Sequence, residues 1–213
     1  FNTVFNNAEY KRHCFDEVLK AWQFIFQKET IATYLHAPPR REHVKYLKQV
    51  RKFSLILKSM YQIVGSSHAS PKNLKFFLKE LGNYIDQYDL PSSNQVANKL
   101  LEEKSLWENL ELPETVTYAE NTGFIRNLRN IVQDINQLFL ETTLPVKKFH
   151  RLRKRIRTLM NLMQIPAAEH LEGNEHWLFY SLFMLSKELG DQHDTLVQAG
   201  LRGNLSYEES IVE

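Results

Sequence analysis

Apolar residues recur every three to four positions along most of the chain, which is the spacing of one face of an α-helix. Prolines, glycines and serine pairs interrupt this spacing and mark where one helix ends and the next begins. The pattern predicts helices over residues 9–35, 41–64, 71–88, 91–112, 121–141 and 145–166, a seventh after Gly173 and an eighth after Gly190. The only weak strand pattern covers residues 115–118.

The composition supports this helical interpretation. The chain has seven glycines and seven prolines among 213 residues, and so few helix breakers favour long helices. No apolar run reaches the roughly 18 residues of a membrane span. Cys14 is the single cysteine, which excludes an internal disulfide and a zinc site built on several cysteines. We therefore expect an all-α protein of the cytoplasm that does not contact a membrane.

A short motif occurs twice, 108 positions apart. Residues 78–86 and 186–194 share five of nine residues, the run Lys-Glu-Leu-Gly and a following Asp. A basic helix precedes each copy by a similar interval. The sequence therefore predicts two repeats of four helices each, over residues 1–112 and 113–213.

The net charge of +2 conceals a strong asymmetry. Residues 40–58 contain seven Lys or Arg and one acid, and residues 147–157 contain seven Lys or Arg and no acid. These two segments hold fourteen of the 27 basic residues, so the rest of the chain is acidic. Concentrated positive charge indicates an anionic partner.

In the second basic helix, the cations gather on one side. At about 100° per residue, Lys147, His150, Arg153, Lys154 and Arg157 fall within one sector of about 120°. The apolar residues of this helix fall on the opposite side. We therefore expect Arg153 and Arg157 to face away from the core, where their replacement by Glu would remove binding without unfolding the chain.

The first basic helix has the same design. Arg41, Lys45, Lys48 and Lys52 share one side, and Lys45, Lys48 and Lys52 repeat the spacing of His150, Arg153 and Arg157. Like charges on one face repel each other, whereas a solvated helix face normally mixes signs. Two such faces at matching repeat positions predict anion binding.

Residues 149–159 resemble the signature helix of the CHAD family (conserved histidine α-helical domain). His150, Arg153 and Arg157 match its His and basic positions, and Leu189, Gly190 and Asp194 match the LG-x-x-x-D element that follows. In the first repeat, Leu81, Gly82 and Asp86 match the same element, but Lys45 replaces the histidine and Ile85 replaces the usual Arg.

The resemblance implies a single CHAD-like domain over residues 1–213, built from two four-helix bundles related by a pseudo-twofold axis. It implies binding of inorganic polyphosphate in a basic groove between the bundles, without catalysis, metal or cofactor. The expected binding residues are the nine of the two basic faces: Arg41, Lys45, Lys48, Lys52, Lys147, His150, Arg153, Lys154 and Arg157. His150 would donate a hydrogen bond to phosphate, more strongly at lower pH. Such a protein would lie in the cytoplasm, where it can associate with polyphosphate granules.

Nucleic-acid binding is the alternative, because basic helices also contact nucleic-acid phosphates. The chain has no helix-turn-helix spacing and no RNA-module signature. Its aromatic residues have the spacing of a helix core, so we expect them to be buried rather than to stack on bases: Trp22, Phe24, Phe26, Trp177, Phe179, Tyr180 and Phe183. An enzyme is less favoured, because P-loop, Rossmann and nucleophile-elbow motifs are missing from the sequence.

Overall fold

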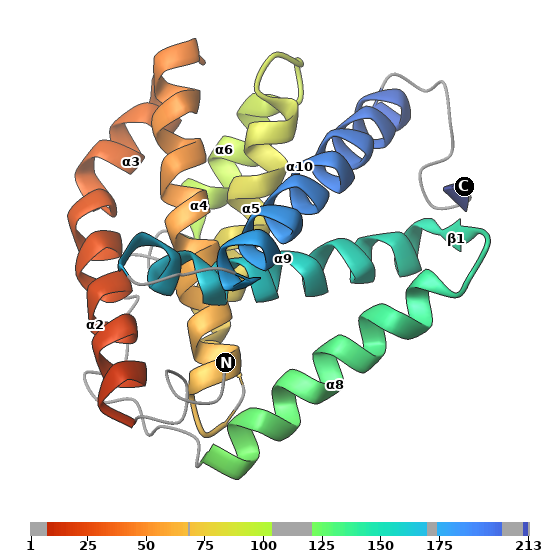
Figure 1. The fold of residues 1–213 in the computed structure, drawn as a ribbon. Helices are drawn as coiled ribbons and strands as arrows, with labels where there is room; N and C mark the ends of the chain where they lie inside the picture. Colours follow the sequence, from red (N-terminus) through yellow and green to blue (C-terminus); the bar gives the residue numbers. More distant parts are fainter. Residues whose placement is uncertain (1–7, 68, 104–120, 170–173, 202–210, 213) are drawn as a thin grey trace. The chain divides into compact units, whose positions relative to one another are not determined.

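The computed structural model describes residues 8–67, 69–103, 121–169, 174–201 and 211–212. Helices make up almost all of these ranges (Figure 1). They are α2 (Ala8–Ile25), α3 (Lys28–His36), α4 (Arg41–Val64), α5 (Lys72–Gln87), α6 (Ser93–Glu102), α8 (Asn121–Phe139), α9 (Val146–Glu169) and α10 (Asn174–Leu201). A two-residue strand β1 (Leu144–Pro145) pairs antiparallel with β2 (Ile211–Val212). The predicted all-α class is confirmed.

The sequence pattern located most helices, and α4 begins and ends at the predicted residues. The first predicted helix is wrong, because it divides into α2 and α3 at Gln27, whose backbone is extended (φ −93°, ψ 105°). The Gln27 side chain donates hydrogen bonds of 3.3 and 2.9 Å to the carbonyls of Gln23 and Phe24. These bonds satisfy carbonyls that α2 leaves open at its end, so the helix stops without a glycine or proline.

Two predicted helix ends are also wrong. Pro166 does not end α9, which continues to Glu169. Gly190 does not separate a seventh helix from an eighth, since α10 is continuous from Asn174 to Leu201. A helical glycine costs only about 1 kcal/mol relative to alanine, which packing readily offsets. A third predicted end is wrong as well, because α6 stops at Glu102, where Glu103 leaves the helical conformation (φ −87°, ψ 23°), and does not run on to residue 112 as one helix. The weak strand over residues 115–118 lies outside the described residues.

The chain divides into two compact units at residues 119/120. The N-terminal unit contains α2 to α6, and α4 packs against both α2 and α5. Trp22 of α2 donates a 2.8 Å hydrogen bond to the buried Ser54 hydroxyl of α4. The Phe26 ring stacks on Trp22 and meets Phe77 of α5 edge-on at 5.2 Å. These core contacts fix the rotation of α4 about its axis, so they also determine which residues of α4 face outward.

The C-terminal unit contains α8, α9 and α10, and α9 packs against both of the others. Figure 1 shows α8 and α9 joined through the turn at β1. Phe124 of α8 and Phe149 and Ile156 of α9 are each at most 1% exposed. Because α9 has a helix on two sides, only part of its circumference faces solvent.

The expectation that the aromatic residues are all core residues holds only in part. Trp22 and Phe26 are buried, but Phe24 is 81% exposed. On α10, Trp177 is 68% exposed, Tyr180 50% and Phe183 47%. The N-terminal half of α10 therefore carries an apolar surface within its own unit. Among the described helices, none is long and apolar enough to cross a membrane.

Candidate functional site

The outer side of α4 carries the four predicted cations, which we call the α4 basic face: Arg41, Lys45, Lys48 and Lys52. All four are exposed. Within the described ranges, none of them forms an ion pair with an acid, although Glu42 lies in the same helix. The face therefore presents positive charge to solvent that no described carboxylate neutralises.

A tyrosine anchors the start of α4. The Tyr46 hydroxyl donates a 2.7 Å hydrogen bond to the Ile25 carbonyl at the end of α2. Burial of this phenol raises its pKa. The Tyr34 ring stacks on His43 at 4.2 Å and meets Tyr46 edge-on. These contacts hold the first turns of α4 in place, so Arg41 and Lys45 extend from a fixed backbone.

Arg51 lies at the edge of the α4 basic face and is partly buried. Its guanidinium lies against Gly82 of α5, where an added methyl group would come within 3.1 Å of Nε and Nη2. The Nε–H is buried and has no hydrogen-bond acceptor among the residues that the structure describes. Arg51 thus holds its charge near the surface in a position that α5 determines.

The predicted cations of α9 differ more in exposure. This face, the α9 basic face, comprises Lys147, His150, Arg153, Lys154 and Arg157. Lys147 and Lys154 are exposed, whereas His150 and Arg157 are partly buried. Arg153 is only 9% exposed, so the expectation that it faces away from the core is wrong. Its Nη2 atom lies 3.8 Å from Oδ1 of Asp194, because α10 packs over this part of α9.

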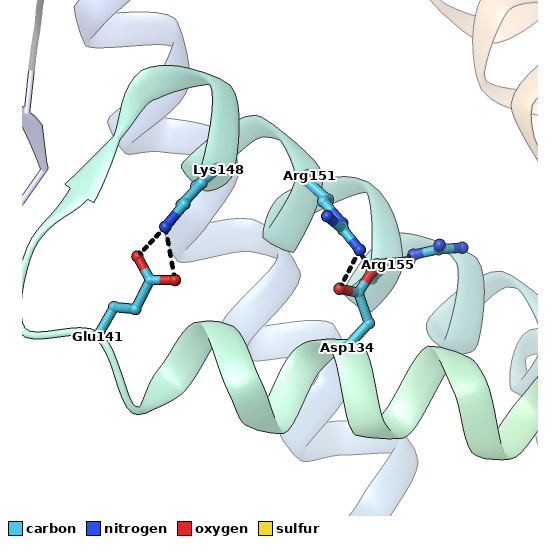
Figure 2. Close-up of polar contacts among 5 residues, drawn as sticks. All are labelled: Asp134, Glu141, Lys148, Arg151 and Arg155. Atoms are coloured by element: carbon cyan, nitrogen blue, oxygen red, sulfur yellow. Dashed lines mark hydrogen bonds and ion pairs between the residues drawn. The ribbon is translucent and has the colours of Figure 1, made fainter.

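Other cations of α9 are neutralised by acids of the same unit (Figure 2). Arg151 and Arg155 each donate a 2.8 Å hydrogen bond from Nε to Oδ2 of Asp134, a buried residue of α8. Burial raises the pKa of Asp134, but the two arginines outweigh it and the pKa is lowered overall. Lys148 pairs with Glu141 at 2.7 Å. Arg151 and Arg155 thus join α9 to α8, and Lys148 joins α9 to the turn after α8. None of these three cations belongs to the predicted binding set.

His150 is neutral at neutral pH. Desolvation, together with Lys154, His193, Arg153 and Arg157, lowers its pKa from 6.5 to about 3. Its ring stacks on His193 of α10 at 5.3 Å, and its Nδ1 has no hydrogen-bond partner in the described ranges. The expected gain of charge on mild acidification is therefore wrong for the unliganded protein. A neutral imidazole still donates one hydrogen bond.

Lys154 shows the same crowding of charge. Desolvation and the nearby Arg157 and Arg153 lower the pKa of its ammonium group. Repulsion of this kind favours an anion between the cations, because an anion would relieve it. Among the described residues, no group of three His, Cys, Asp or Glu side chains is arranged to hold a metal ion. The α9 basic face thus combines cationic donors with one neutral donor, His150.

Comparison of the chain with protein-family models, curated proteins and solved structures gives no match. Membership of the CHAD family therefore stays a prediction from residues 149–159 and the repeated motif.

Sequence reasoning missed two features of the site. Asp134 is a lone acid on the inner side of the amphipathic helix α8, and that position was the available signal. By spacing alone, Lys48 of the first repeat corresponds to Arg153 of the second. In the structure, however, Arg51 lies against Gly82 of the repeated motif, and Arg153 lies near Gly190 at the matching position. The repeated Gly82 and Gly190 could have revealed this correspondence.

Proposed function

We propose that this protein binds inorganic polyphosphate through the α4 and α9 basic faces and does not transform it. One observation carries the proposal: six predicted binding residues are exposed cations that form no ion pair with a described acid. They are Arg41, Lys45, Lys48, Lys52, Lys147 and Lys154. Because unneutralised like charges on one helix face destabilise it, a bound polyanion would stabilise both faces.

The chemistry of polyphosphate suits these faces. The polymer carries about one charge per phosphate and has no planar group to stack, so its receptor needs rows of cations. Lysines act as point charges, and an arginine offers a fork of donors to phosphate oxygens. Binding would release counterions and weaken steeply with salt.

The CHAD resemblance supports the same conclusion. In each compact unit, an arginine of the basic helix lies against or near the glycine of the repeated motif: Arg51 with Gly82, and Arg153 with Gly190. This correspondence supports an internal repeat, and we retain the pseudo-twofold relation between the repeats as part of the proposal. The described part of the C-terminal unit has three helices rather than four, because α10 is continuous. A cytoplasmic location at polyphosphate granules belongs to the proposal as well.

Charge reversal tests the proposal. Lys45→Glu, Lys48→Glu and Lys52→Glu together should weaken binding of a labelled long-chain polyphosphate at least about 1000-fold, at roughly tenfold per lost contact. The matched control replaces Lys72 and Lys75 by Glu, since both are exposed lysines of the same unit on α5. Fluorescence anisotropy with all three proteins measures the loss. Equal binding by the reversed and the control variant would refute the proposal.

A nucleic acid is the second candidate ligand, and the exposed aromatic residues of α10 favour it. Bases stack on exposed Trp and Tyr rings, at about 1–3 kcal/mol per base. If single-stranded RNA is the ligand, Trp177→Ala should weaken RNA binding by about tenfold or more. The same substitution should leave polyphosphate binding unchanged, because polyphosphate has no bases.

A further inference from the structure

We propose that Gly82 of α5 is a positioning residue. Because glycine has no side chain, the Arg51 guanidinium can lie against α5, and there it serves as a tenth polyphosphate-binding residue. This inference rests on the proposed function and adds a guanidinium to the lysine-rich α4 basic face. It identifies what determines the direction of that guanidinium.

The packing at Gly82 leaves little room for a side chain, so a methyl group there would require the neighbouring guanidinium to shift by a few tenths of an ångström. A methyl group at this position would lie 3.1 Å from Nε, 3.1 Å from Nη2 and 3.4 Å from Cζ of Arg51. All three atoms belong to one guanidinium, so the glycine contacts the charged end of Arg51. A buried glycine inside a helix is less favourable than alanine, so its presence here indicates a requirement for space.

The charge of Arg51 is held but not neutralised. No ion pair or hydrogen bond joins Arg51 to another described residue, and its buried Nε–H has no acceptor. Asp134 shows the contrasting arrangement, in which an arginine of α9 is neutralised inside its own unit. A guanidinium fixed by steric fit alone keeps its remaining donors for a ligand.

Gly190 provides an internal comparison. A methyl group there would lie 4.0 Å from Nη2 of Arg153, which is an ordinary contact distance. Arg153 is also held by Asp194, at 3.8 Å. The structure thus predicts that alanine is tolerated at Gly190 and displaces the arginine at Gly82.

Holding Arg51 in place should increase affinity. Arg51 and Lys48 are three residues apart on α4, so their side chains lie side by side. An arginine that is already ordered loses less rotamer freedom on binding than a mobile one. Gly82→Ala would push the guanidinium away from α5 by a few tenths of an ångström and release it from this fixed position, so its contact with phosphate should weaken.

The test titrates labelled long-chain polyphosphate into the wild type, Gly82→Ala, Gly190→Ala, Arg51→Ala and the double variant of residues 51 and 82. We expect Gly82→Ala and Arg51→Ala each to weaken binding about tenfold. Each should also make the negative slope of log K against log salt shallower by about 0.7. Gly190→Ala should change the affinity less than twofold. In the Arg51→Ala background, Gly82→Ala should have no further effect.

Wild-type affinity and salt slope in Gly82→Ala would overturn the inference, as would a further loss in the double variant. No binding by the wild type would instead refute the proposed function itself. If Gly82→Ala does not fold, the double variant decides by its circular dichroism. A folded double variant shows that Arg51 caused the clash and supports the inference, whereas an unfolded one shows that the glycine serves backbone packing alone.

Discussion

The two basic segments, residues 40–58 and 147–157, carry seven Lys or Arg each but use them differently. On α4, the exposed cations of the basic face form no ion pair with a described acid. On α9, Arg151 and Arg155 bind Asp134, Lys148 binds Glu141, and Arg153 is buried near Asp194. The comparison teaches that the charge counted in a sequence is larger than the charge available to a ligand.

The difference has a structural cause. Because α9 packs against α8 and α10, its cations meet acids of those helices on two sides. The neighbours α2 and α5 contact the apolar side of α4, and the exposed cations lie on the opposite side. Under the proposed function, α4 therefore provides most of the cations that a ligand can reach, whereas several cations of α9 hold its unit together.

Two double variants of α9 should differ most in their affinity for polyphosphate. Lys147→Gln with Lys154→Gln removes two cations that no described acid neutralises, so we expect polyphosphate to bind about 100-fold more weakly. Lys148→Gln with Arg151→Gln removes two neutralised cations, and affinity should stay within about threefold. Titration calorimetry compares the two. Similar losses would show that total charge, and not available charge, determines binding.

Asp134→Asn should separate the two roles of α9. The substitution removes a carboxylate that accepts hydrogen bonds from two arginines, which we expect to lower the free energy of unfolding by about 2 kcal/mol. It also releases Arg151 and Arg155, so polyphosphate affinity should be unchanged or higher. Urea unfolding and anisotropy measure the two effects. A parallel loss of stability and affinity would contradict this separation.

Acidification should destabilise the C-terminal unit through His150. Its pKa is about 3 in the folded protein and near 6.5 when unfolded, so between these values the unfolded chain binds the proton more strongly. Stability is therefore complete above about pH 6.5 and declines as the pH falls through this window. We expect Tm to fall by about 5 °C more in the wild type than in His150→Gln between pH 7 and 4.5.

Asp134 should contribute little to the change in stability between pH 7 and 4.5. Its lowered pKa makes that carboxylate stabilising above about 3.8, and the stabilisation is lost only at more acidic pH. His36→Gln serves as the control, because His36 is an exposed histidine of α3. An identical pH dependence in the wild type and in His150→Gln would show that His150 does not resist protonation.

Neighbouring lysines give the smallest expected effect. Lys147 has no acid partner in the described ranges, whereas Lys148 is bound to Glu141. Lys147→Gln should make the negative slope of log K against log salt shallower by about 0.7, because one counterion fewer is released. Lys148→Gln should leave the slope unchanged within error. Equal slopes for the two variants would contradict the assignment of Lys148 to Glu141.

Helical periodicity was sufficient to predict most of the fold. It located α4, α5, α8 and α9 because their apolar residues follow one face, and prolines precede α4, α5 and α9. It failed at Gln27, where side-chain hydrogen bonds end α2. It also failed at Gly190, since tertiary packing outweighs the low helix propensity of a single glycine.

A helical wheel predicts which side of a single helix a residue occupies, and only that part of the site could be predicted from the sequence. The wheel placed the exposed lysines of both helices correctly, because each lies opposite an apolar side. It placed Arg153 on the outside, since it contains no information about α10 packing over α9. The lowered pKa of His150 has the same origin, because its burial and its contact with His193 depend on that packing.

The central claim is that the α4 and α9 basic faces bind polyphosphate specifically and are not generic basic surfaces. A competition titration tests it most directly, with labelled long-chain polyphosphate displaced by single-stranded DNA or RNA of equal charge at low salt and at about 150 mM salt. At the higher salt the Debye length is about 8 Å, so distant charges are screened. We predict that polyphosphate stays bound and that nucleic acid competes poorly. Equal competition by nucleic acid, with both interactions lost at the higher salt, would contradict the claim.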